Sequence, residues 1–164
     1  MKPLSRIAKI GDIIFITQVT RRRHPIFADE KNIKILFQTL HEVQCIKKCN
    51  IFSFVIMPDH MHLIIRSKIS LSDDIMNSLK INFFLNWKKQ KYESMQKDPA
   101  SFWQRRHYEH VIWNEKEFLS HINYVYNNPV KHGYVESPDE WPYSSFSEFS
   151  LQREMGIETI ETPM

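Results

Sequence analysis

The chain has 164 residues, of which 42% are hydrophobic and 13% aromatic, and its formal net charge is +3. This length suits one globular domain that buries its own core. Glycine occurs only 3 times. Neither the P-loop pattern nor the dinucleotide-binding glycine pattern is present, which argues against a glycine-rich loop for nucleotide phosphates.

The two cysteines, Cys45 and Cys49, are four residues apart on one predicted helix face, where a disulfide is geometrically awkward. We therefore expect a reduced, cytoplasmic protein. The N-terminal sequence MKPLSRIAKIGD lacks the apolar stretch of a signal peptide. No run of about 18 apolar residues is present to span a membrane, so no membrane partner is expected.

The first half of the chain predicts a strand, a helix and a hairpin. Residues 11–20 (GDIIFITQVT) are rich in β-branched and aromatic side chains and predict a strand. A helix is expected from Asp29, as its N-cap, to about residue 48, because apolar residues recur at helical spacing. Residues 51–57 and 60–66 predict two strands, and the turn signal Pro58-Asp59 between them indicates a hairpin.

The second half predicts a helix, a strand and a last helix. The first of these helices begins at Ser72, and residues 91–101 are expected to form an exposed loop. Residues 102–113 partly alternate in polarity and predict a strand. Asn114 can cap the last helix, with Glu117 completing a capping-box-like pair. Pro129 cannot continue a helix, so this one is expected to end by residue 128.

The predicted order of elements is β-α-β-β-α-β-α. It indicates an α+β domain with an antiparallel or mixed sheet and helices packed on it, and a ferredoxin-like arrangement fits this order. We expect one domain over residues 1–150 and a weakly ordered tail over residues 151–164.

Basic residues are clustered rather than evenly spread, although each cluster alone is also compatible with an ordinary solvated surface. Several clusters lie near aromatic residues in the sequence, which favours a nucleic-acid surface because basic groups meet phosphates and aromatic rings stack on unpaired bases. The candidate phosphate contacts are Arg21, Arg22, Arg23, Arg105 and Arg106.

His60 and His62 form an HxH pair on a predicted strand. Side chains on a strand alternate between faces, so both imidazoles project from the same face and can hold one divalent ion, while Met61 points to the other face. Eight histidines occur in the chain, so HxH alone is a weak signal, and taken alone it favours two partly exposed, hydrogen-bonded histidines without a metal.

The last helix has an apolar side and a polar side. At about 100° per residue, the polar side gathers Glu117, His121, Tyr124 and Asn128. The apolar side, expected to face the core, gathers Phe118, Leu119, Ile122, Val125 and Tyr126. Tyr126 is thus interpreted as a core residue, and Tyr124 as a tyrosine held away from the core beside Asn128.

Together, the strand and the helix offer a chemical site. A divalent ion held by His60 and His62 can withdraw charge from a DNA phosphate. The Tyr124 hydroxyl can then attack the phosphorus and form a covalent phosphotyrosine. An oxygen of Asn128 can serve as a third ligand, which suits a hard ion such as Mg²⁺.

Four sequence blocks resemble those of the HUH single-tyrosine transposases, and specifically the REP-associated tyrosine transposase group. Residues 58–63 (PDHMHL) resemble the PxHxH-type strand, and residues 102–110 (FWQRRHYEH) resemble the block before the last strand. Residues 124–135 (YVYNNPVKHGYV) resemble the YIHxNPVxxGxV block, and residues 141–146 (WPYSSF) resemble the WPWSSF block. The resemblance spans roughly residues 10–147, with the blocks in order.

This resemblance implies a ferredoxin-like fold, a Mg²⁺ or Mn²⁺ site with His60, His62 and Asn128 as ligands, and Tyr124 as the nucleophile of a 5′-phosphotyrosine link. It also implies that the substrate is single-stranded hairpin DNA from repetitive extragenic palindromes (REP). A bacterial, nucleoid-associated protein that is a monomer or homodimer is the corresponding expectation. The chain departs from the group at Tyr126, where the family's usual residue is histidine.

Two alternatives remain open on sequence alone. One is a hairpin-binding protein derived from such a transposase that no longer cuts DNA. The other is a zinc-stabilised module that uses Cys45, Cys49, His60 and His62, although this cysteine spacing is poor for structural zinc.

Overall fold

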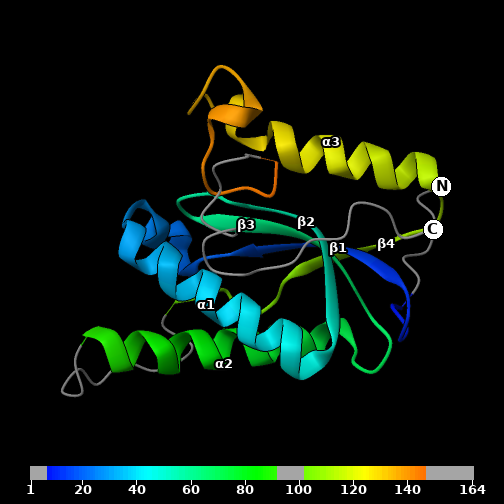
Figure 1. Cartoon of the computed structure of the whole chain (residues 1–164), viewed down its shortest axis with the longest axis horizontal. Coiled ribbons are helices and arrows are strands. Elements are labelled where there is room, and N and C mark those ends of the chain that lie inside the picture. The colour runs from blue at the N-terminus through cyan, green and yellow to red at the C-terminus, as the bar shows by residue number, and fades with distance from the viewer. Residues whose placement is uncertain (1–6, 92–101, 147–164) are drawn as a thin grey trace.

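The computed structural model describes residues 7–91 and 102–146 and is built around a four-stranded antiparallel sheet with strand order β2-β3-β1-β4 (Figure 1). The strands are β1 (Ile13–Val19), β2 (Cys49–Ile56), β3 (His60–Ser67) and β4 (Tyr108–Ile112). The main helices are α1 (Glu30–Lys47), α2 (Ser72–Lys91) and α3 (Glu115–Lys131). Helices α1 and α2 lie on one face of the sheet and α3 lies on the other. The ferredoxin-like α+β prediction is confirmed, with every strand pair antiparallel.

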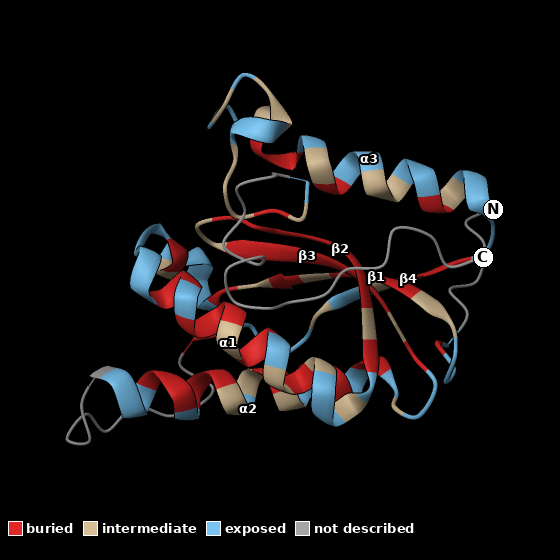
Figure 2. Ribbon diagram, in the orientation of Figure 1, coloured by how far each residue is buried: buried red, intermediate tan, exposed pale blue. Residues whose placement is uncertain are grey.

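The sheet is covered on both faces, so β2 and β3 are buried along almost their whole length (Figure 2). On β3, Met61, Leu63 and Ile65 belong to the core beneath α1 and α2. Ile64 belongs to a second core, which also contains Phe118 and Val125 of α3. Because side chains alternate along a strand, His60 and His62 share the face of Ile64 and lie beneath α3.

Helix α1 begins and ends as its sequence predicts. The Asp29 side chain accepts a hydrogen bond from the Lys31 backbone N–H at 2.9 Å and caps the helix N-terminus. Lys48 ends the helix in the left-handed conformation, with φ of 46°. The chain then turns directly into β2, which places the β2–β3 hairpin under the helix.

The predicted strand over residues 102–113 is correct only in its second half. Phe102 and Trp103 are consecutive, yet both are buried in the core beneath α1 and α2, which two neighbours in a regular strand cannot do. Their rings contact Phe83 of α2 at centroid distances of 5.4 and 5.5 Å. Because both rings are buried on one side, this segment cannot form a regular strand, and the regular pairing with β1 begins only at Tyr108. The predicted loop over residues 91–101 and tail over residues 151–164 lie outside the described residues, apart from Lys91, which ends α2.

The predicted end of α3 at residue 128 is wrong, because the helix continues through Pro129 to Lys131. A proline in the last turn removes only one helical hydrogen bond. The turn is closed by other donors: the backbone N–H of His132 donates to Asn128 O, and that of Tyr134 donates to Pro129 O, both at 3.0 Å. Asn128 therefore lies inside a regular helix.

At the other end of α3, Asn114 caps the helix by accepting from the Glu117 backbone N–H at 2.9 Å. In a capping box the Glu117 carboxylate would accept a hydrogen bond from the Asn114 backbone N–H. Here it accepts instead from the backbone N–H of Trp113, one residue earlier, at 2.7 Å. The hydrogen bond from Trp113 is the largest of the effects that lower the pKa of the Glu117 carboxyl below its ordinary value. Burial acts to raise this pKa, and the hydrogen bond and charge of His110 and the charge of His121 lower it further.

Residues 141–146 cover the open edge of the sheet at β2. The backbone N–H of Ile56 donates to Tyr143 O at 2.8 Å, and the Trp141 indole N–H donates to Ile56 O at 3.0 Å. Ser145 Oγ accepts from the Phe54 backbone N–H at 3.0 Å. The segment with the WPYSSF sequence thus protects an edge strand that would otherwise expose unpaired backbone groups.

Among the described residues, no helix is long and apolar enough to cross a membrane. Both cysteines are free thiols, but they do not share a helix face as predicted, because Cys45 is exposed on α1 and Cys49 is buried at the start of β2.

Candidate active site

His60, His62 and Asn128 meet between β3 and α3. The Nε2 atom of His60 lies 3.2 Å from Asn128 Oδ1, and the Nε2 atom of His62 lies 3.2 Å from Asn128 Nδ2. All three side chains are buried, and Asn128 has 0% of its surface exposed. The structure therefore brings together the three side chains that the sequence suggests as metal ligands.

Two further residues, which the sequence analysis does not identify, orient the histidines. Asp59 Oδ1 lies 2.6 Å from His60 Nδ1, and Thr17 Oγ1 lies 2.8 Å from His62 Nδ1. Because the Nδ1 atom of each ring is hydrogen-bonded to Asp59 or Thr17, the Nε2 atom of each ring points toward Asn128. Such partners fix ring orientation and raise the basicity of metal-binding histidines. The Asp next to the HxH pair was visible in the sequence, whereas Thr17 becomes visible only through its register opposite His62.

The electrostatics of this cluster keep Asp59 ionised and His62 neutral. Burial acts to raise the pKa of the Asp59 carboxyl, but hydrogen bonds and charges from His60 and Arg23 outweigh it and hold this pKa below its ordinary value. Burial lowers the pKa of His62 to about 3, and the nearby charges of His60, His132 and Lys131 add to this effect. A neutral imidazole can bind a metal without first losing a proton.

Tyr124 lies beside the histidines and remains accessible, with 41% of its surface exposed. Its ring meets that of His62 edge-on at a centroid distance of 5.2 Å. The Lys131 Nζ atom lies 5.2 Å from the centre of the Tyr124 ring. The Tyr124 ring therefore lies near both His62 and a positive charge.

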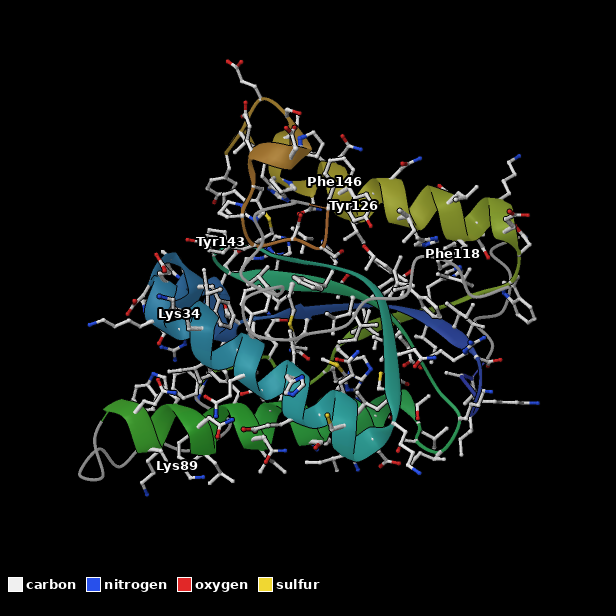
Figure 3. The ribbon with its side chains drawn as sticks, viewed as in Figure 1. Lys34, Lys89, Phe118, Tyr126, Tyr143 and Phe146 are labelled. Carbon is white, nitrogen blue, oxygen red and sulfur yellow. The ribbon has the colours of Figure 1, made fainter. Side chains whose placement is uncertain are left out.

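Tyr126 has different surroundings. Its ring packs against Phe146 at a centroid distance of 4.7 Å and against the core that contains Phe118 (Figure 3). The interpretation of Tyr126 as a packing residue agrees with these contacts.

The predicted faces of α3 need one correction. Leu119, expected in the core, is 54% exposed, whereas Asn128, expected on the polar side, is fully buried. The side of α3 that faces the sheet carries Asn128 together with Phe118 and Val125, while Tyr124 lies at its exposed margin. Asn128 can be buried there because His60 and His62 provide hydrogen-bond partners for its carboxamide.

The five candidate phosphate-binding arginines are exposed and come from two adjacent segments. Arg21, Arg22 and Arg23 form a short 3₁₀ turn after β1, and Arg105 and Arg106 precede β4. The segments are joined by backbone hydrogen bonds from Arg21 N–H to Phe102 O at 3.0 Å and from Gln104 N–H to Val19 O at 2.9 Å. Arg23 also pairs with Asp59 at 3.2 Å, which links this turn to His60.

Asp73, His107 and Glu109 form a second group of metal-type ligands, with one ligand atom of each within 4.8 Å of the others. This group, which was not predicted from the sequence, could hold a divalent ion. Glu109 pairs with Ile16 in the sheet, and Ile16 belongs to the core beneath α1 and α2. The group therefore lies on the opposite face of the sheet from Tyr124.

The zinc-module alternative is not supported by the geometry. Cys49 pairs with Ser67 at one end of β3, whereas His60 begins the other end. At about 3.3 Å per residue these ends are roughly 20 Å apart, so one ion cannot bind both. Burial also raises the pKa of the Cys49 thiol to about 12, which disfavours the thiolate that zinc requires.

Comparisons with known proteins agree with this geometry. The sequence matches the family described as "Transposase IS200 like" over residues 13–128. The REP-associated tyrosine transposase of Escherichia coli K12 is 30% identical over 139 residues, which cover 84% of this chain and 78% of that protein. A relative from Haemophilus influenzae, whose name also contains REP-associated tyrosine transposase, is 39% identical over 104 residues, which cover 56% of this chain and 55% of the relative. The chain thus spans about half the length of this second relative.

A solved structure described as a REP-associated tyrosine transposase bound to a REP hairpin has the same fold. It matches with a TM-score of 0.73 and 25% identity, and the match covers 100% of this chain and 95% of that chain.

Proposed function

The chain belongs to the IS200-like transposase family, and on that premise we propose that it cuts and rejoins single-stranded hairpin DNA through a 5′-phosphotyrosine at Tyr124. The convergence of His60, His62 and Asn128 beside an accessible tyrosine carries this proposal.

The donor set fits a divalent metal. Both Nε2 atoms face the Asn128 carboxamide, which presents its oxygen to His60 and its nitrogen to His62, and Asp59 and Thr17 hold the two rings in this orientation. A Mg²⁺ or Mn²⁺ ion held by His60, His62 and Asn128 would polarise a non-bridging oxygen of the scissile phosphate.

Tyr124 supplies the nucleophile in this proposal. Its hydroxyl oxygen forms a bond to phosphorus while the bond from phosphorus to the 3′ oxygen breaks, and the phenolic proton is released as the 3′ hydroxyl takes one up. The phosphoester bond energy is retained, so attack by a 3′ hydroxyl in the reverse direction rejoins the strand. Lys131 beside the Tyr124 ring would attract the phosphate.

Hairpin recognition forms the second part of the proposal. The hairpin-bound relative has the same fold along the whole chain. Arg21, Arg22 and Arg23 together with Arg105 and Arg106 form an exposed basic surface on two neighbouring segments. We assign these arginines to the DNA backbone, whose phosphates supply most of the affinity for such proteins. A nucleoid-associated location in bacterial cytoplasm follows if DNA is the partner.

The test is direct. The full chain is mixed with an end-labelled REP-type hairpin and Mg²⁺ or Mn²⁺, and products are separated on a denaturing gel. A covalent protein–DNA band that maps to the Tyr124 peptide is expected. Tight hairpin binding with no covalent band under any divalent ion would instead identify a hairpin-binding protein that no longer cuts.

A further inference from the structure

An open cavity of about 320 Å³ lies beside Tyr124. It is lined by Phe15 of β1, Tyr108 of β4 and Ser120, His121 and Tyr124 of α3. This volume is at the lower end of the roughly 300–1,000 Å³ typical of small-ligand sites. None of the five lining side chains is a lysine, arginine or carboxylate, so the cavity suits a planar uncharged group better than a phosphate.

The walls of the cavity are aromatic and centre on Phe15. The Phe15 ring meets Tyr108 and Tyr124 edge-on at centroid distances of 6.3 and 5.8 Å. The same ring also stacks on His62 at a centroid distance of 5.4 Å, so a side chain that lines the cavity contacts the histidine pair. Tyr124 contacts both Phe15 and His62 and therefore links the wall of the cavity to the candidate metal ligands.

His121 adds a hydrogen-bonding group to the aromatic walls of the cavity. Its Nδ1 donates to the Glu117 backbone carbonyl at 2.8 Å, so Nδ1 carries the proton and a neutral ring has its lone pair on Nε2. One face of the ring stacks on His110 at 5.2 Å, and His110 is held by Glu117 at 3.1 Å. Within residues 7–91 and 102–146, no hydrogen-bond partner is found for His121 Nε2, which leaves this acceptor for a ligand.

We propose that this cavity receives the base of a nucleotide adjoining the scissile phosphate. The inference rests on the proposed function, because it assumes that DNA reaches Tyr124. A base has a π-face for the Tyr108 and Phe15 rings and edge groups for His121 and Ser120. With the base in the cavity and the phosphate on the histidine side, the scissile bond would lie over the Tyr124 hydroxyl.

Binding without cleavage provides the first test. A fluorescent adenine analogue is placed at each unpaired position beside the hairpin, and each DNA is titrated with the Tyr124→Phe protein in chelator. At one position, stacking in the cavity should quench the fluorescence. Tyr108→Ala in the same background should restore it, whereas Leu85→Ala, which removes a 45% exposed side chain from α2 on the opposite face, should not. No quenching at any position, or quenching that survives Tyr108→Ala, overturns the proposal.

Cleavage provides the second test. An abasic site at the quenched position should slow covalent adduct formation by the wild-type protein about 5- to 150-fold, the factor for one lost base–aromatic stack. Tyr108→Ala should cause a similar loss on the normal hairpin and little further loss on the abasic one, because both changes remove the same contact. Additive losses would contradict the shared contact. If wild-type protein forms no adduct at all, the proposed function fails, and the fluorescence experiment still decides whether the cavity binds a base.

Discussion

Tyr124 and Tyr126 are two residues apart on α3, but only Tyr124 lies beside the histidines. Substitution by Phe removes the hydroxyl and keeps the ring. Tyr124→Phe should fold, bind the hairpin and form no covalent adduct on a denaturing gel. Tyr126→Phe should retain adduct formation, with a stability change of at most about 1 kcal/mol from a lost hydrogen bond. An adduct mapped to Tyr126, or an undiminished adduct in Tyr124→Phe, would contradict the assignment of the nucleophile.

Asp59 should act as a positioning residue through His60. Asn in its place keeps the shape but replaces an ionic hydrogen bond by a weaker neutral one. We expect Asp59→Asn to raise the Mn²⁺ concentration for half-maximal adduct formation by roughly 10- to 100-fold, with hairpin affinity nearly unchanged. Asp74→Asn, an exposed carboxyl change on α2, is the matched control. Equal Mn²⁺ midpoints for Asp59→Asn and the wild type would rule out this role.

His62 should make stability depend on pH. Its folded-state pKa of about 3 is below the ordinary value of 6.5. Above the ordinary value neither state binds a proton, so the full stability is present. As the pH falls from there toward the folded-state pKa, only the unfolded state takes up a proton, and the free energy of unfolding falls by up to about 1.4 kcal/mol per pH unit.

Denaturant unfolding in chelator between about pH 7 and pH 5 measures this slope. His62→Gln lacks the titrating group and should show a shallower decline than the wild type. Parallel pH profiles for the two proteins would show that His62 is not held neutral in the folded state.

At the scale of elements, the 3₁₀ turn after β1 presents Arg21 and Arg22 to solvent, while Arg23 pairs with Asp59. The double variant Arg21→Ala/Arg22→Ala should weaken hairpin binding and reduce the slope of log affinity against log salt by about 0.7–0.9 per lost phosphate contact. Lys88→Ala/Lys89→Ala removes the same charge from exposed positions near the end of α2 (Lys89 is labelled in Figure 3). A salt slope of the arginine variant equal to that of the wild type would exclude the arginine turn from the DNA contact.

The elements were predictable where local pattern determines them. Period-two alternation correctly places His60 and His62 on one face of β3, and the turn signal at Pro58-Asp59 correctly predicts the hairpin. Tertiary contacts decide the rest. Thr17 reaches His62 only because β1 pairs with β3, and Asn128 is buried only because the two histidines lie beneath it. A helical-wheel argument treats a polar residue as exposed and therefore misses a buried polar network.

At the scale of the whole molecule, the sheet separates two groups of potential metal ligands. His60, His62 and Asn128 lie on the α3 face with Tyr124. Asp73, His107 and Glu109 lie on the other face, at the start of α2 and β4. Because a buried sheet lies between them, an ion in the second group cannot contact a phosphate that Tyr124 attacks.

This separation gives a matched pair of histidine variants. His62→Ala should abolish covalent adduct formation while retaining most hairpin affinity, because the arginines that bind phosphate are elsewhere. His107→Ala removes the same type of side chain from the opposite face and should cleave at a rate close to that of the wild type. Chelator should stop cleavage by the wild type and by His107→Ala, and added Mg²⁺ or Mn²⁺ should restore cleavage by both.

Cleavage that persists in chelator would reject the metal requirement. Loss of cleavage in His107→Ala together with full activity in His62→Ala would transfer the catalytic metal to Asp73, His107 and Glu109, and the proposed arrangement around Tyr124 would be wrong.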